Sequence, residues 1–181
     1  MTSGIPNNRR FSPHQKLDAL VRRAHRQWNS GELRSAFQLF LSAAKQGESS
    51  AQLDLGYFYD VGIGVARNRS AAIRWCRCAF RNGIAGGANN IGTIYRDEGD
   101  AKRALFWFER AGRLGDIDAN LEVAKIRIQL DGGNDGAIPY LKRIAAAEAG
   151  AEVTQFSHEQ ALRLSKSNKP HSKKCPIKSR L

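Results

Sequence analysis

The stretch that decides the fold runs from Ser50 to Gly83 and reads SSAQLDLGYFYDVGIGVARNRSAAIRWCRCAFRNG. Apolar residues in its first part recur at spacings of three and four, which is typical of a helix with one buried face. Gly62 and Gly64 then interrupt this helix, because glycine favours turns and costs about 1 kcal/mol inside a helix. A second periodic run ends at Gly83, where a C-cap glycine is expected. The stretch therefore predicts one helical hairpin.

The same hairpin pattern recurs along the chain. An apolar residue, a small residue and a long side chain three positions later occur as Leu55-Gly56-x-x-Tyr59, Ile91-Gly92-x-x-Tyr95 and, more weakly, Val123-Ala124-x-x-Arg127. The following helix repeats an alanine and a large residue at Ala36/Leu39, Ala72/Trp75, Ala104/Trp107 and Ala137/Tyr140. The glycines that end the hairpins keep the same interval, at Gly47, Gly83, Gly115 and Gly150. Such a period predicts a helical solenoid, in which neighbouring repeats bury one another's apolar faces. In this register, Trp75 and Trp107 should be buried at equivalent places.

The most specific part of the pattern is the run from Leu55 to Val65 with its Gly62-x-Gly64-Val65 turn, followed by the helix from Ala72 to Gly83. This run resembles the SEL-one-like repeat, a relative of the tetratricopeptide repeat. The resemblance covers about residues 16–150, although this chain has Asn68 near the place where the family usually has an acid. It implies a superhelix of helical hairpins that binds other proteins, and it implies no active site.

The predicted fold is all-α: a right-handed α-solenoid of about four helix-turn-helix repeats followed by a C-terminal capping helix. The repeats span residues 16–150, and the capping helix spans residues 151–164. Residues 1–15 are expected to form a flexible N-terminal segment. Residues 165–181 hold six lysines and arginines, two prolines and no acid, so they are expected to form a disordered basic tail.

Composition narrows the class of protein. The chain has 181 residues, an ordinary apolar content of 41% and a formal net charge of +12. Its three cysteines do not form a disulfide framework, which favours a reducing compartment, and we expect a cytoplasmic protein. No apolar run approaches the roughly 20 residues that span a bilayer. The positive charge suits a protein or peptide partner with acidic groups, but it says nothing about the fold.

The sequence offers no set of residues arranged for catalysis. Cys76-x-Cys78 is the one paired-thiol motif, and metal sites of this kind need a second pair or histidines at a set spacing. On a helix the two thiols point about 200° apart. The Gly62-x-Gly64 turn follows a helix rather than a strand, so it is not a dinucleotide-binding loop. We therefore predict a non-enzymatic protein without a cofactor or a metal ion.

In the resembling families the first helix of each hairpin lines a concave groove. Placing the Gly56, Gly92 and Ala124 motif on that helix leaves aromatic, amide and charged side chains facing the groove. Such a surface suits an extended peptide, because aromatic anchors supply binding energy and amides satisfy backbone groups. The alternative for each residue is packing against the neighbouring repeat or a terminal segment. The predicted groove residues are His25, Trp28, Leu53, Tyr57, Asp60, Asn89, Thr93, Arg96, Lys125 and Ile128.

A basic patch provides the second functional hypothesis. No acid occurs between Asp60 and Asp97, and Arg74, Arg77 and Arg81 in this interval share one helix face. They either dock a carboxylate-rich or phosphate-bearing partner or form a solvated outer face. Together with the tail, the interval from Arg67 to Arg96 gives an alternative function, nucleic-acid or acidic-surface binding. The absence of aromatic residues from the tail disfavours nucleic acid, because no side chain there can stack on bases.

Overall fold

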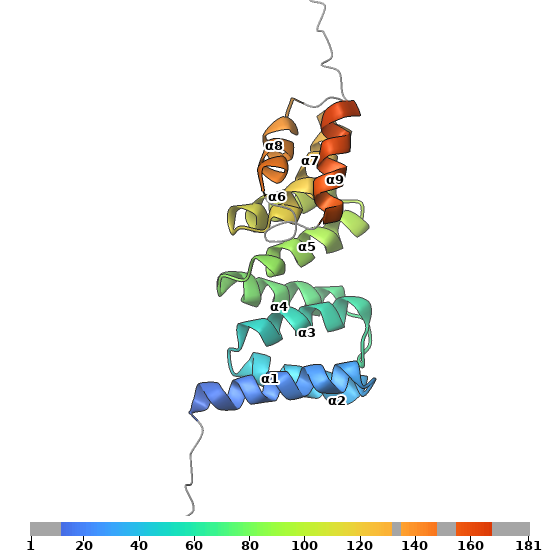
Figure 1. Cartoon of the computed structure of the whole chain (residues 1–181). Helices are drawn as coiled ribbons and strands as arrows, with labels where there is room; N and C mark the ends of the chain where they lie inside the picture. Colours follow the sequence, from blue (N-terminus) through green and yellow to red (C-terminus); the bar gives the residue numbers. More distant parts are fainter. Residues whose placement is uncertain (1–11, 132–134, 148–154, 168–181) are drawn as a thin grey trace, which may run out of the picture. The chain divides into compact units, whose positions relative to one another are not determined.

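The computed structural model describes residues 12–131, 135–147 and 155–167, with the side chains of residues 159–166 in the last segment. These residues form nine helices and no strand (Figure 1). The helices are α1 Pro13–Asn29, α2 Leu33–Lys45, α3 Ser49–Val61, α4 Arg69–Arg81, α5 Ala85–Asp97, α6 Ala101–Arg113, α7 Ile117–Asp131, α8 Ile138–Ala146 and α9 Gln155–Ser167. The predicted all-α solenoid of four helical hairpins followed by one further helix is confirmed.

The chain divides into two compact units, residues 1–90 (unit 1) and residues 91–181 (unit 2). In unit 1, α1 packs against α2, α2 against α3 and α3 against α4 (Figure 1). The core of unit 1 combines small alanines with large side chains such as Phe40, Leu55 and Phe58, all fully buried. In unit 2, α6 packs against α7, α7 against α8 and α8 against α9. Leu141 and Ile144 are in the core between the last three helices.

Polar caps and glycines set the helix ends. Three side chains each accept a hydrogen bond from the backbone N–H three residues further on, which satisfies a group that the helix leaves open: Asn68 (2.9 Å), Asp100 (2.9 Å) and Asp116 (3.0 Å). Three of the predicted terminating glycines have the left-handed backbone that other residues rarely adopt: Gly47 (φ 91°), Gly83 (φ 85°) and Gly115 (φ 94°). The fourth, Gly150, lies outside the described residues.

Three helix ends differ from the sequence prediction. Helix α1 begins at Pro13 rather than at Lys16, because Ser12 and Gln15 form a reciprocal capping box with hydrogen bonds of 2.9 and 3.2 Å. Helix α8 ends at Ala146, before the predicted terminating glycine Gly150, because Ala147 has extended backbone. Helix α9 continues past Leu164 to Ser167. The rest of the two terminal segments, residues 1–11 and 168–181, lies outside the described residues.

The burial predicted for Trp75 and Trp107 is wrong. Both side chains are only partly buried. The next residue along each helix takes the deep position instead, since Cys76 and Phe108 are both fully buried. Each of these side chains faces a glycine of the preceding helix, and the closeness of that contact leaves no room there for an indole.

Candidate functional site

Three predicted groove residues of unit 1 meet in one aromatic cluster. Helix α1 supplies His25 and Trp28, helix α3 supplies Tyr57, and we call these residues the α1–α3 cluster. The Trp28 ring centroid lies 5.9 Å from that of Tyr57 and 6.1 Å from that of His25. Tyr57 is 42% exposed, whereas Trp28 and His25 are half-buried. The first helices of two successive hairpins thus present a shared aromatic surface.

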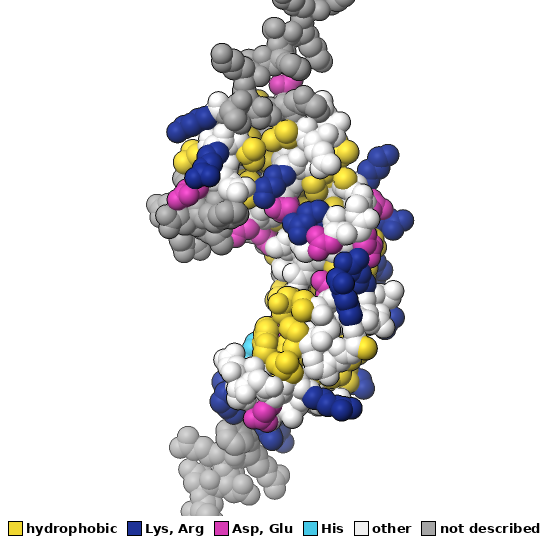
Figure 2. Space-filling view, turned by 90° about the vertical axis from the view of Figure 1, so that its right-hand side faces the viewer, with side chains coloured by type: hydrophobic (Ala, Val, Ile, Leu, Met, Phe, Trp, Pro, Cys, Tyr) yellow, Lys and Arg dark blue, Asp and Glu magenta, His cyan; other side chains and the backbone are white. Residues whose placement is uncertain are grey.

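Two fully buried phenylalanines support this cluster from below. The Trp28 ring meets Phe58 edge to face at a centroid distance of 5.0 Å and meets Phe40 at 6.3 Å. Such contacts hold the Trp28 ring in place, so little side-chain freedom is left to lose when a ligand binds. Figure 2 shows hydrophobic side chains gathered beside a histidine on one face, in the lower half of the view.

Asp54 adds a carboxylate to the edge of the cluster. Its Oδ2 lies 3.2 Å from His25 Nε2. Burial raises the pKa of Asp54 to about 6, although the charge of His25 acts in the opposite direction. Asp54 was not among the predicted groove residues. The available signal was its position three residues before Tyr57, which places both side chains on the same face of α3.

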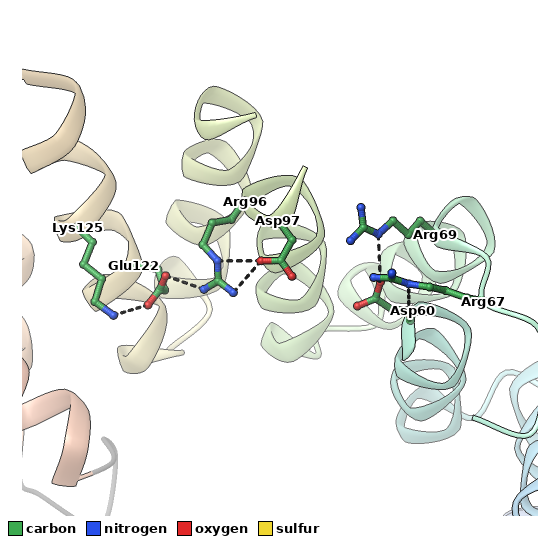
Figure 3. A network of polar contacts seen from close by, with 7 residues as sticks. All are labelled: Asp60, Arg67, Arg69, Arg96, Asp97, Glu122 and Lys125. Atoms are coloured by element: carbon green, nitrogen blue, oxygen red, sulfur yellow. Dashed lines mark hydrogen bonds and ion pairs between the residues drawn. The ribbon is translucent and has the colours of Figure 1, made fainter. Parts of the chain in front are cut away.

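Asp60 lies at the other end of α3 and interacts with the glycine turn. Arg67 Nε donates a hydrogen bond of 2.6 Å to the Asp60 carbonyl oxygen. Asp60 Oδ1 lies 3.7 Å from both Arg67 Nη2 and Arg69 Nε, which is ion-pair distance but too long for a hydrogen bond (Figure 3). Two of the arginines in the acid-free interval therefore close the turn that follows α3.

The other two predicted groove residues of unit 1 are partly buried. Leu53 packs against the backbone of Gly86 at the start of α5, and Asn89 is on the next turn of that helix. Neither residue is among the ring contacts of the α1–α3 cluster. The structure thus brings His25, Trp28 and Tyr57 together, whereas Leu53 packs against the start of α5.

In unit 2 the predicted groove residues Arg96 and Lys125 share one carboxylate. Glu122 accepts hydrogen bonds from Arg96 Nη1 and Lys125 Nζ, both at 2.8 Å, and Arg96 also binds Asp97 at 3.1 Å (Figure 3). Burial alone would raise the pKa of Glu122, but the hydrogen bonds from Lys125 and Arg96 outweigh it and lower that pKa. Sequence analysis did not identify Glu122, whose position three residues before Lys125 was the available signal.

The remaining two predicted groove residues of unit 2 are Thr93 and Ile128. Both are partly buried. Ile128 packs against the core formed by α7, α8 and α9, which is the alternative that the sequence left open for it. Thr93 is one helical turn before Arg96 on α5.

The predicted basic patch is on α4, where Arg74, Arg77 and Arg81 are all exposed. The cysteines of the same helix do not form a reactive pair. Burial raises the pKa of the Cys76 thiol to about 12, against the effect of a hydrogen bond from the Asn90 side chain. The Cys76 thiol is therefore protonated at neutral pH and is a poor nucleophile or metal ligand.

Comparison with known proteins identifies the repeat. The family model for the Sel1 repeat matches residues 32–48, 49–84 and 89–116. Three segments of this chain match the Sel1 repeat. The resemblance drawn from residues 55–83 is confirmed, and the second and third matched segments coincide with the α3/α4 and α5/α6 hairpins.

Similar proteins extend the likeness beyond the matched segments. The putative sel1-like repeat-containing protein L21 of Acanthamoeba polyphaga mimivirus is 23% identical over 115 residues, which are 62% of this chain and 21% of the viral protein. The crystal structure of a Sel1 repeat protein from Oxalobacter formigenes matches with a TM-score of 0.60 at 26% identity, over 74% of this chain and 58% of that one. The structure of c5321, a protective antigen of uropathogenic Escherichia coli with an SLR fold, matches with a TM-score of 0.59 at 27% identity, over 75% and 30%. The chain thus spans about a fifth of the viral relative, and 58% and 30% of the two solved chains.

Proteins built from Sel1 repeats generally act as protein-interaction scaffolds. In this chain the α1–α3 cluster joins α1 to the first helix of the segment that matches the Sel1 repeat at residues 49–84. In the described part of the chain, no helix is both long enough and apolar enough to cross a membrane.

Proposed function

We propose that the chain is a non-enzymatic adaptor that binds a peptide segment of a partner protein across the α1–α3 cluster. The observation that carries this proposal is the exposed ring of Tyr57, which lies 5.9 Å from a Trp28 ring packed on the buried core. Tyrosine and tryptophan are enriched among the residues that dominate binding energy at protein interfaces. Because the buried core already holds the Trp28 ring in place, this aromatic surface binds an apolar side chain with little loss of its own conformational entropy.

Asp54 defines the polar part of this surface. Its carboxylate is partly exposed and lies beside the aromatic rings, where it can accept a hydrogen bond from a peptide N–H or from a basic side chain. The peptide that fits best has a large apolar residue next to a hydrogen-bond donor. We extend the proposed surface of unit 1 to Asp60, Asn89 and the exposed part of Leu53, and we assign Thr93, Arg96 and Lys125 a matching role in unit 2, where Ile128 contributes only the part of its side chain that the core leaves exposed.

In unit 2 the shared carboxylate of Glu122 supports that assignment for Arg96 and Lys125. Because both cations donate to Glu122, their side chains have defined directions before any partner arrives. Arg96 retains part of its surface exposed to solvent. A guanidinium held in this way can donate further hydrogen bonds to peptide carbonyl groups.

Selection from a display library of random peptides tests the proposal. The full chain is the bait, and the Tyr57→Ala variant is the bait in a parallel selection. We expect the wild-type chain to enrich peptides with a shared large apolar residue, and the Tyr57→Ala variant to lose those sequences. Leu130→Ala is the matched control, because Leu130 is also an exposed apolar residue, at 49%, and is on α7 of unit 2. Equal enrichment by Tyr57→Ala and the wild type would contradict the proposal.

The exposed arginines Arg74, Arg77 and Arg81 support a second candidate, the binding of an acidic or phosphate-bearing partner. Electrostatic binding to phosphates weakens steeply with salt, whereas an aromatic anchor does not. Replacement of these three arginines by glutamine separates the two candidates, because it should leave peptide binding at the α1–α3 cluster intact.

Both described cysteines are free, which supports our proposal of a cytoplasmic location.

A further inference from the structure

Helix α6 in unit 2 has an exposed stripe that the proposed function does not use. Four of its members are spaced four residues apart and the fifth is three residues after the third, so they share one face of the helix. We call this set the α6 stripe: Lys102, Phe106, Arg110, Arg113 and Leu114. Phe106 is 47% exposed and Leu114 is 46% exposed. Two apolar side chains therefore lie among three cations on this surface.

Arg110 is held in a defined position within the stripe. Its guanidinium carbon lies 3.3 Å from the centroid of the Phe106 ring and 5.9 Å from that of Trp107. Its Nη1 donates a hydrogen bond of 3.3 Å to the Phe106 carbonyl oxygen. Stacking on the ring orients the planar guanidinium, whose fork of N–H donors matches a carboxylate.

Two acids that are close to the stripe in the sequence already have partners. Asp100 binds Arg103 at 3.2 Å, and Glu109 binds Arg127 at 2.6 Å. No ion pair within the described part of the chain involves Lys102, Arg110 or Arg113. In the described residues, the three cations of the stripe are therefore not held in ion pairs with neighbouring carboxylates.

We propose that the α6 stripe is a second docking surface, which binds an acidic peptide segment of a partner protein. Lys102, Phe106 and Arg110 are about 6 Å apart along the helix axis. Alternate residues of an extended peptide are about 6.8 Å apart, so the two carboxylates of a Glu-x-Leu-x-Glu segment can reach Lys102 and Arg110, while its leucine contacts the part of the Phe106 side chain that the guanidinium leaves exposed. This charge complementarity commits the surface to an acidic occupant.

The stacked geometry favours a peptide over nucleic acid. Single-stranded nucleic acid would need an open ring face on which a base could stack. The guanidinium of Arg110 covers a face of Phe106 at 3.3 Å, so that face is not open. Leu114 adds an aliphatic surface at the end of the stripe, which suits a peptide side chain.

Fluorescence anisotropy with the full chain tests this proposal. The probe is a labelled peptide with two Glu-Ser-Leu-Ser-Glu units, compared with a peptide of the same sequence in which glutamine replaces each glutamate. We expect the acidic peptide to bind at least about tenfold more tightly than the glutamine peptide. Arg110→Gln should weaken its binding about tenfold, and Arg110→Lys should weaken it less because the charge remains. The control Arg143→Gln, an exposed arginine of α8 in the same unit, should change it less than about twofold.

The contrary outcomes are equally definite. The proposal is overturned if neither peptide binds, if both bind alike, or if Arg110→Gln and Arg143→Gln have the same effect. Tighter binding of a labelled oligothymidylate that is also lost in Arg110→Gln would assign the stripe to nucleic acid instead. Thermal melting of each variant verifies that it is folded. Tyr57→Ala should leave this binding unchanged, so failure here and failure at the α1–α3 cluster are distinguishable.

Discussion

Gly92 lies directly against the ring of Phe108, so that a Cβ atom at position 92 would be 2.8 Å from two ring carbons. Gly56 has the same relation to Cys76 one repeat earlier, where a Cβ would collide with the thiol sulfur. In both hairpins a fully buried side chain of the second helix occupies the space left by a glycine of the first. The repeated glycine motif therefore marks where two helices come closest.

This relation predicts a large cost for Gly92→Ala. The added methyl group meets an aromatic ring that is fully buried and has nowhere to move, so we expect a loss of about 1–3 kcal/mol in the free energy of unfolding. Gly86→Ala on the same helix is the matched control, because a Cβ there meets only the flexible end of Leu53. Urea unfolding measures both variants. Equal stability of the two would contradict the close contact at Gly92.

On α6 the fully buried residue is Phe108 and not the neighbouring Trp107. We therefore predict that Phe108 contributes more than Trp107 to the stability of the fold. Phe108→Ala removes a fully buried ring and should cost about 3–5 kcal/mol. Trp107→Ala should cost less than half as much, because the indole is only partly buried. Thermal melting of the two variants compares them directly. A larger destabilisation by Trp107→Ala would restore the register that the sequence suggested.

The raised pKa of Asp54 leads us to predict that the free energy of unfolding falls as the pH rises from about 4 to about 6. Its pKa is raised by burial to about 6 in the folded chain, against about 4 when unfolded, so the folded state binds more protons between these values. The stabilising contribution is present below pH 4 and is lost as the pH passes 6. Asp54→Asn removes this titration, so the variant should gain about 1–2 kcal/mol relative to the wild type between pH 4 and pH 7. Parallel stability curves for the two proteins would contradict this.

For Glu122 in unit 2 we predict the opposite pH dependence of stability. Burial alone would raise the pKa of Glu122. The hydrogen bonds from Lys125 and Arg96 lower it by a larger amount, so the net pKa is below its ordinary value. The contribution of Glu122 to stability is therefore present above about pH 4.5 and is lost as the pH falls. Glu122→Gln should destabilise the chain at pH 7 by about 0.5–1 kcal/mol and should match the wild type near pH 3. The idea fails if the variant is as stable as the wild type at pH 7.

Much of the fold could be predicted because periodicity and glycine are local signals. The spacing of Gly56 and Gly92 located the hairpins, and the glycines Gly83 and Gly115 located their ends. The depth of individual side chains could not be predicted, because Trp75 and Cys76 differ by only one position on a helix. Which of the two is buried depends on how closely α3 approaches α4, and the glycine contact sets that distance.

The candidate site was predictable only in part, for a related reason. Helical position indicated that Trp28 and Tyr57 face the same side of their hairpins, and the structure brings them together. The charged partners, Asp54 for His25 and Glu122 for Arg96, come from residues 29 and 26 positions away. Such pairs depend on the registration of one helix against another, which the local sequence pattern does not specify.

Binding at Tyr57 tests the central claim most directly. A peptide selected on the full chain is titrated by calorimetry into the wild type, Tyr57→Ala, Tyr57→Phe and the control Leu130→Ala. Our account predicts that Tyr57→Ala weakens binding at least about tenfold, and that Tyr57→Phe and Leu130→Ala stay within about threefold of the wild type. Binding by Tyr57→Ala at wild-type affinity, with the variant folded, would contradict the account.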